Sequence, residues 1–303
     1  MSTIRNIHVG TCSWAEKTLI ASGEFYPKGT TSAEERLRYY ASRFDTVEVD
    51  STYYAIPATR TAELWAARTP ENFIFHIKAY GALTGHGINP QTLPKSLREM
   101  LSSSDRVKRT IHVADPSLLK DVADAFAASL QPLRSAGKLG VLVFQYPPWF
   151  WYKKENLDYI LKCRELMGSM PLAVEFRHGS WLTHYHAENT LKFLRENGIT
   201  YVTTDEPQFG SLATAPFLPA VTTDIAYLRL HGRNKRTWLK KGIETSLRYD
   251  YLYSGEELKE FAGAAAGLSL KAGMAYIMFN NCHGGFAVQN ALDTLMLLGI
   301  TPT

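Results

Sequence analysis

The sequence predicts an α/β protein of the TIM (β/α)8 barrel class, and three observations support this. Strand-like apolar runs alternate with stretches of helical periodicity along the whole chain, which is the pattern of a parallel sheet built from βα units. A length of 303 residues with 45% hydrophobic side chains is enough to bury the core of such a barrel. Several apolar runs also end in charged residues, as strands do where they reach the mouth of a barrel.

Eight runs have the length and apolar content of buried strands. They occupy residues 7–12, 46–52, 73–79, 139–145, 172–177, 200–205, 226–231 and 275–280. Helical spacing of apolar residues fills most of the gaps between them, most clearly at 33–44, 157–167, 189–197 and 258–268. A last helix over about 287–298 would close the ring.

Two connections depart from the simple alternation. Residues 81–137 are far more than one crossover helix needs, so we expect part of this stretch to cover the mouth. Residues 207–223 contain three prolines and no helical period, so we expect the helix after the sixth strand to be missing or reduced. No linker or break in composition divides the chain, which predicts a single barrel domain over 1–303.

Composition limits the function classes. A net charge of +4 permits anionic ligands but lacks the concentrated positive charge of a typical nucleic-acid binder. Cys12, Cys163 and Cys282 have neither metal-type nor disulfide-type spacing, which indicates a reducing compartment. The first residues have no apolar signal core, and no run reaches the roughly 18 apolar residues of a membrane span, so we expect a cytoplasmic protein without a membrane partner.

Polar side chains at the strand ends form the candidate site. In such barrels the chemistry lies at the carboxyl ends of the strands. Side chains alternate along a strand, so polar residues of matching parity are expected to share one cavity, although mutual ion pairing would explain any single one of them. This selection gives Glu48, Asp50, His76, Lys78, Gln145, Glu175, Arg177, Asp205, Arg229 and His231.

The end of the eighth strand carries a different signal. Asn280 and Asn281 are followed by Gly284 and Gly285, which lead directly into the last predicted helix. Glycines let backbone amides approach a ligand, and a helix N-terminus attracts negative charge, so an anion site is predicted here. A tight turn that requires glycine is the alternative.

Motifs spread over nearly the whole chain carry a family resemblance. They include Gly10-Thr-Cys-Ser-Trp14, Val47-Glu-Val-Asp-Ser-Thr-Tyr-Tyr-Ala-Ile-Pro57, Val174-Glu-Phe-Arg-His178 and Tyr227-Leu-Arg-Leu-His-Gly232. In these motifs the chain resembles the DUF72, or YecE-like, family. The resemblance implies a TIM-type barrel and the same mouth residues, but it brings no mechanism. Cys12 and Cys282 stand where other residue types are expected, which counts against either cysteine as an essential nucleophile.

The residue types favour acid–base chemistry on a small anionic or sugar-like substrate, without a resident cofactor. The catalytic candidates are Glu48, Glu175, Asp205 and His231. Cations would hold the negative charge of the substrate, and aromatic residues would stack on its ring. The remaining binding candidates are Trp14, Asp50, Tyr53, His76, Lys78, Gln145, Arg177, Trp181, Arg229, Asn280, Asn281, Gly284 and Gly285.

Four alternatives stay open. The catalytic candidates would also suit a divalent metal in an isomerase or phosphoesterase. Glu48 and Glu175 would be the carboxylate pair of a glycosidase, and Lys78 would form a Schiff base if burial depressed its pKa. The basic and aromatic stretch 233–253 is expected either to bind nucleic acid or to close as a lid over the substrate.

Overall fold

The computed structural model describes residues 6–301, in which eight strands form one parallel sheet, as predicted. The strands are paired in the order β1-β8-β7-β6-β5-β4-β3-β2, and every ladder between them is parallel. Their bounds are β1 Ile7–Thr11, β2 Thr46–Val49, β3 Ile74–Lys78, β4 Leu139–Gln145, β5 Leu172–Glu175, β6 Thr200–Asp205, β7 Ile225–Leu230 and β8 Met274–Phe279.

A tyrosine side chain bridges the two ends of this order. The Tyr40 hydroxyl accepts a hydrogen bond from the Thr11 amide at 2.9 Å and donates to the Thr46 carbonyl at 3.2 Å. The strands approach closely here, since a Cβ atom on Gly10 would come within 2.4 Å of the Thr46 carbonyl oxygen. The seam of the barrel between β1 and β2 is therefore joined by a helix side chain as well as by packing.

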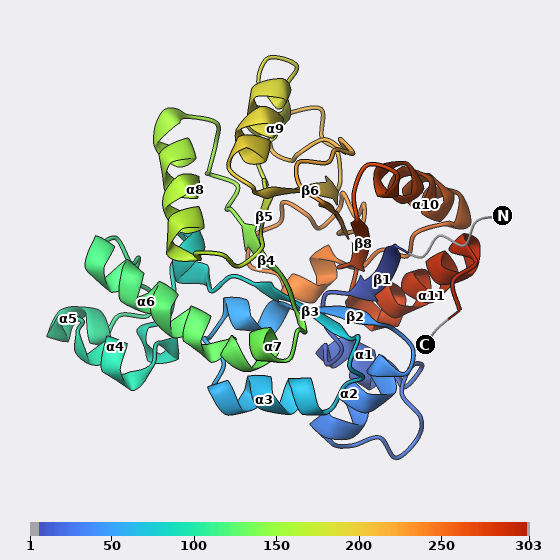
Figure 1. Cartoon of the computed structure of the whole chain (residues 1–303), viewed down its shortest axis with the longest axis horizontal. Helices are drawn as coiled ribbons and strands as arrows, with labels where there is room; N and C mark the ends of the chain where they lie inside the picture. Colours follow the sequence, from blue (N-terminus) through green and yellow to red (C-terminus); the bar gives the residue numbers. More distant parts are fainter. Residues whose placement is uncertain (1–5, 302–303) are drawn as a thin grey trace.

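Helices surround the strands, as Figure 1 shows. Serine caps begin two of them: Ser32 forms a capping box with Glu35, and Ser254 forms one with Glu257. The helices on the barrel are α1 Lys17–Ser22, α2 Ala33–Ala41, α3 Thr59–Ala67, α6 Pro116–Ser129, α7 Gln131–Ser135, α8 Lys154–Leu166, α9 Ala187–Glu196, α10 Gly255–Ser269 and α11 Phe286–Leu298.

The long connection between β3 and β4 extends mostly sideways. Its crossover helix is α6, which Asp115 caps and Pro116 begins. The short helices α4 (Lys95–Glu99) and α5 (Ser103–Arg106) lie at the outer edge of the molecule (Figure 1). Near its start, His86 packs edge-on against the Tyr53 ring with centroids 5.2 Å apart, so this part of the connection reaches the mouth.

The connection between β6 and β7 has no helix among its described residues, which confirms the prediction for 207–223. It is held by polar contacts instead. The Thr222 hydroxyl donates to the Ile199 carbonyl at 2.7 Å and accepts from the Tyr201 amide at 2.8 Å. Within residues 6–301, no helix is both long and apolar enough to cross a bilayer.

The barrel interior is filled by a small apolar layer that lies below the mouth. It contains Val141 and Val143 of β4, Ala173 of β5 and Val202 of β6, together with Cys12, Tyr227, Tyr276 and Met278. Because side chains alternate, the inward positions that follow this cluster are Gln145 on β4, Glu175 on β5, Arg229 on β7 and Asn280 after β8. This next layer is polar, and it forms the candidate site.

Candidate functional site

The guanidinium of Arg229 forms the centre of a buried ion network. Its side chain is fully buried, and it donates to carboxylates from opposite parts of the ring. Nη2 lies 2.6 Å from Glu48 Oε1, while Nη1 donates to Glu175 Oε2 and to Gln145 Oε1 at 3.0 Å. The predicted convergence of β2, β4, β5 and β7 residues is therefore present in the structure.

Glu175 is held as a carboxylate. Burial alone would raise its pKa, but Arg229, His231 and Arg177 outweigh burial and lower the pKa well below its usual range. Arg177 Nη1 donates to Glu175 Oε1 at 2.8 Å, and His231 Nε2 lies 3.1 Å from the same oxygen. Asn280 donates its amide to His231 Nδ1 at 2.8 Å, so Nε2 carries the proton. Burial lowers the pKa of His231 to about 3, which makes it a neutral donor rather than an acid.

The pKa of Glu48 is shifted in the opposite direction, upwards. Burial raises the pKa of Glu48 to about 7; Arg229 lowers it, and the neighbouring Asp50 raises it further. The Tyr227 hydroxyl donates to Glu48 Oε2 at 2.9 Å. Asp50 Oδ1 lies 3.5 Å from both Arg229 Nη2 and Lys78 Nζ. Glu48 is therefore a buried carboxyl group that can hold a proton near neutral pH.

Glu206 also belongs to this network, and the sequence analysis missed it. It follows β6 directly, its side chain is buried, and Arg177 Nε lies 3.3 Å from its Oε2. Its Oε1 accepts from the Ala215 amide at 2.7 Å. Burial raises the pKa of Glu206 to about 7, while Arg177 acts in the opposite direction. Residue 206 lies on the same face as Val202, which points into the barrel interior, so the structure places Glu206 inward.

Three charged groups of the network reach the solvent side. The exposed fractions of the side chains are 27% for Asp50, 12% for Lys78 and 10% for Arg177. Burial lowers the pKa of Lys78, but Asp50, with help from Tyr249, outweighs it and raises the pKa overall. Burial also lowers the pKa of Arg177, but the carboxylates of Glu206 and Glu175 outweigh burial and raise it overall. Lys78, Arg177 and Asp50 are therefore the charged groups of the network nearest to solvent, and each of them is only partly exposed.

The stretch 233–253 lies over this face. Trp238 is buried, and the Arg177 guanidinium lies 5.0 Å from the centroid of its ring. His231 is 6.2 Å from the ring centroids of both Trp238 and Tyr249. The two ends of the loop are joined, because the Gly232 amide donates to the Tyr253 hydroxyl at 2.7 Å. Surface hollows of about 510 and 600 Å³ lie instead at the amino ends of the strands.

The structure separates Asp205 from the other candidates. Its carboxylate points out of the barrel, where it accepts from Arg233 Nη2 at 2.7 Å and from the Tyr253 hydroxyl at 2.6 Å. Arg233 also pairs with Glu257 of α10 at 3.1 Å. The prediction that Asp205 shares the cavity is wrong, because β6 presents Thr204 and Glu206 inward, and the carboxylate instead fixes the start of the loop.

Three other candidates lie in the core rather than at the mouth. His76 is one layer below, with its Nδ1 accepting from the Val141 amide at 3.0 Å and its ring 4.3 Å from that of Tyr276. Burial lowers the pKa of His76 to about 3. Trp14 packs edge-on against Trp65 at 5.9 Å, and Trp181 is fully buried and stacked on Phe150 and Phe176. Tyr53 alone of the predicted aromatic contacts borders the mouth, with Lys78 Nζ 5.2 Å from its ring centroid.

The residues after β8 serve mainly to hold the loops. Asn281 is buried and donates to the Tyr251 carbonyl at 2.8 Å and to Asn290 at 2.9 Å, so it does not face the cavity. Gly284 and Gly285 have φ of 59° and 91°, a conformation that favours glycine, and the Gly284 amide already donates to the Thr18 hydroxyl at 2.8 Å. A tight turn that requires glycine therefore accounts for the pair. The Gly284 amide is already engaged, so it is not free to bind the predicted anion.

The structure also bears on metal binding and on the reactivity of the cysteines. Within residues 6–301, no group of three histidine, cysteine, aspartate or glutamate side chains is placed to hold a metal ion. The cysteines of this part of the chain are free thiols, and Cys12 Sγ lies 3.8 Å from Arg229 Nη2. Burial raises the pKa of Cys12 and of Cys282 well above the usual range, so both thiols stay protonated.

Comparisons with known proteins agree with this architecture. The family described as "Protein of unknown function DUF72" matches residues 8–303. The UPF0759 protein YunF of Bacillus subtilis (strain 168) is 34% identical over 297 residues, which cover 97% of this chain and 95% of that protein. A solved DUF72 family protein from Thermotoga maritima MSB8 is 33% identical with a TM-score of 0.77, and covers 97% of this chain and 100% of its own. Another, from Enterococcus faecalis V583, is 28% identical with a TM-score of 0.80, over 98% and 97% of the two chains. The chain therefore belongs to the DUF72 family.

Proposed function

We propose that this protein is an enzyme that performs acid–base chemistry on a small anionic substrate at the carboxyl end of the barrel. The observation that carries the proposal is that two partly exposed cations, Lys78 and Arg177, contact the carboxyl groups of Asp50, Glu175 and Glu206. The cations would hold a phosphate or carboxylate group of the substrate. The carboxyl groups would then be close enough to give or take a proton.

The proton carrier in this proposal is Glu48, and Asp50 lies between it and the substrate. A group titrating near neutral pH transfers protons best under cellular conditions, and burial raises the pKa of Glu48 to about 7. Asp50 is the more exposed of the two, so it would face the substrate while Glu48 stores the proton. Glu175 stays ionised and balances Arg229, and His231 orients Glu175 through its neutral Nε2–H group.

The other chemistries have less support from the geometry. Arg229 occupies the space between Glu48 and Glu175, where a glycosidase would need the scissile bond. The raised pKa of Lys78 is unfavourable for a Schiff base, which requires an unprotonated amine. The carboxylates that would bind a divalent metal are already engaged by arginines. Trp238 faces Arg177 rather than solvent, which favours the loop as a lid over nucleic-acid stacking.

Solvent deuterium exchange tests the proposal without knowledge of the product. The protein is incubated in D2O with a panel of sugar phosphates and small hydroxy acids, and NMR detects exchange of carbon-bound protons or turnover. We expect at least one compound to react, with loss of the reaction in Glu48→Gln. The exposed replacement Glu34→Gln on α2 is the matched control and should react like the wild type. No reaction with any compound that binds, or full reaction in Glu48→Gln, would contradict the proposal.

A further inference from the structure

A row of aromatic side chains borders one side of the mouth, outside the ion network. Tyr54, Tyr53, His86 and Trp149 follow one another with ring centroids 5.0, 5.2 and 5.7 Å apart. We call these four residues the aromatic ledge. They come from the connections after β2, β3 and β4, so the barrel, rather than one local segment, brings them together.

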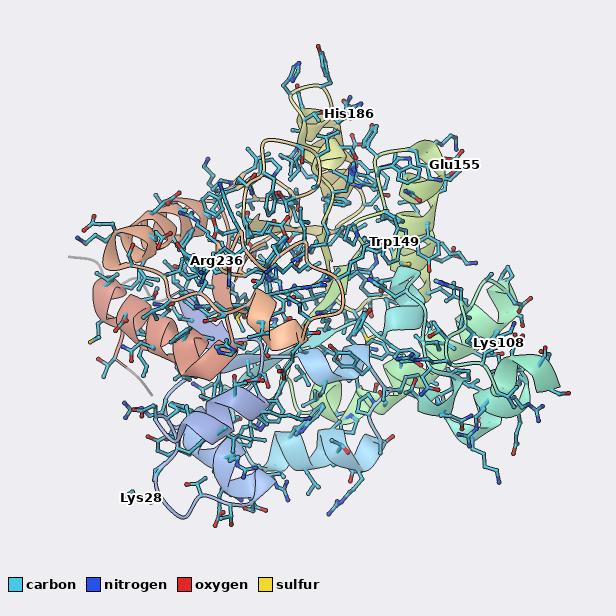
Figure 2. All side chains as sticks on the ribbon, turned by 180° about the vertical axis from the view of Figure 1, so that it is seen from behind. Lys28, Lys108, Trp149, Glu155, His186 and Arg236 are labelled. Carbon is cyan, nitrogen blue, oxygen red and sulfur yellow. The ribbon has the colours of Figure 1, made fainter. Side chains whose placement is uncertain are left out.

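The ends of the ledge face solvent. The exposed fraction is 63% for Tyr54 and 58% for Trp149, so both rings are open to a ligand. Burial lowers the pKa of His86 to about 4, with Lys78 and then His112 acting in the same direction, so its ring is uncharged at neutral pH. Figure 2 shows Trp149 on the same face of the molecule as Arg236 of the 233–253 loop.

The ledge is continuous with the accessible cations. Lys78 Nζ lies 5.2 Å from the centroid of the Tyr53 ring. The Tyr54 ring follows directly, with its centroid 5.0 Å from that of Tyr53. A ligand whose negative group contacts Lys78 would therefore place its remaining atoms within reach of these rings.

We propose that the aromatic ledge is a ring-binding subsite, and that the substrate is a small phosphate or carboxylate compound that carries a ring. The inference rests on the proposed function, because the anion contacts of Lys78 and Arg177 determine where the ring lies. Either an aromatic ring or the apolar face of a pyranose would stack on exposed tyrosine and tryptophan rings. An anion without a ring would leave the ledge empty and bind more weakly.

Calorimetric titration with methyl phosphate, phenyl phosphate and glucose 6-phosphate tests this subsite. We expect at least one ring-bearing phosphate to bind about tenfold more tightly than methyl phosphate, a difference of about 1.4 kcal/mol. Tyr54→Ala and Trp149→Ala should remove this preference and leave the affinity for methyl phosphate unchanged. Both residues are exposed, so the replacements should not disturb folding. Trp151→Ala, another exposed tryptophan whose ring lies 5.4 Å from Lys153 Nζ, is the matched control and should keep the preference.

The outcomes separate the ledge from the anion site. Equal affinity for methyl phosphate and both ring-bearing phosphates would overturn the ledge and leave the anion site in place. A preference that survives in both Tyr54→Ala and Trp149→Ala would also overturn the ledge. Absence of phosphate binding, or binding that Lys78→Met and Arg177→Met leave unchanged, would contradict the anion site and the ledge together. Tighter binding of phenyl phosphate would identify an aromatic ring as the ligand of the ledge, and tighter binding of glucose 6-phosphate would identify a pyranose.

Discussion

Replacement of Arg229 by methionine would measure how much the ion network contributes to the free energy of unfolding. Arg229 is fully buried, and its two terminal nitrogens contact Glu48 and Glu175. Methionine has a similar length but leaves both carboxyl groups without their guanidinium. Removing one partner of a buried ion pair costs about 3–5 kcal/mol, because the other charge stays buried. We therefore expect Arg229→Met to lower the free energy of unfolding by about 4 kcal/mol at about pH 8.

The loss should be smaller at low pH. Burial raises the pKa of Glu48 to about 7 even beside Arg229, so without the guanidinium Glu48 will bind a proton at about pH 5. A protonated Glu48 no longer buries an uncompensated charge, and the double variant Glu48→Gln/Arg229→Met should recover part of the stability lost at about pH 8. The free energy of unfolding of Arg229→Met is thus expected to differ more from that of the wild type in alkaline than in acidic buffer.

Equilibrium urea unfolding followed by circular dichroism measures these differences, provided that unfolding and refolding curves coincide. Arg38→Met on α2 is the matched control, since its partner Glu34 is at the surface, and it should not change the unfolding midpoint measurably. A loss below about 1 kcal/mol for Arg229→Met at about pH 8, or a larger loss in acid, would refute the reasoning.

Three further predictions concern other parts of the barrel. Burial raises the pKa of Glu206 in the folded protein to about 7, so the stability contributed by the protonated side chain is present below the pKa of the unfolded chain and is lost as the pH rises to about 7. Urea unfolding should therefore show that the free energy of unfolding of Glu206→Gln gains roughly 3 kcal/mol relative to the wild type between about pH 4.5 and 7. A difference that does not change with pH would contradict this prediction. Gly10→Ala should lower the free energy of unfolding by about 1–3 kcal/mol, because the added Cβ would lie 2.4 Å from the Thr46 carbonyl oxygen. Gly263→Ala in α10 places its Cβ in open space and should raise the free energy of unfolding by about 0.5–1 kcal/mol. Thermal unfolding compares the two variants, and equal effects would argue against a closed seam between β1 and β2. Native Cys12 should resist iodoacetamide, since it is buried with a raised pKa, and rapid labelling detected by mass spectrometry would show that the site opens readily.

Strand order and the parity of most site residues were predictable from the sequence. In β2, β5 and β7 the charged residues Glu48, Glu175 and Arg229 each lie between apolar neighbours, and the structure brings these three side chains together. β6 is different, because all of its side chains are buried and threonines lie on both faces. Its pattern therefore could not distinguish Asp205 from Glu206 as the inward residue.

Other features depend on contacts between segments that are distant in sequence. Trp14 and Trp181 lie next to the mouth in sequence, but their packing partners Trp65 and Phe150 are in other connections. The bridge from Tyr40 across the seam likewise requires the helix to be docked on the strands. The single-domain organisation and the cytoplasmic location stay predictions from the sequence.

An anomalous diffraction measurement on crystals soaked in selenate tests the central claim most directly, because selenate is an anion that can be identified by its scattering. The account predicts an ordered selenate at the carboxyl end of the barrel, with oxygens within hydrogen-bond distance of Arg177 and Lys78 and beside Tyr53. Selenate confined to exposed lysines of the outer helices, with none at Arg177 and Lys78, would contradict it.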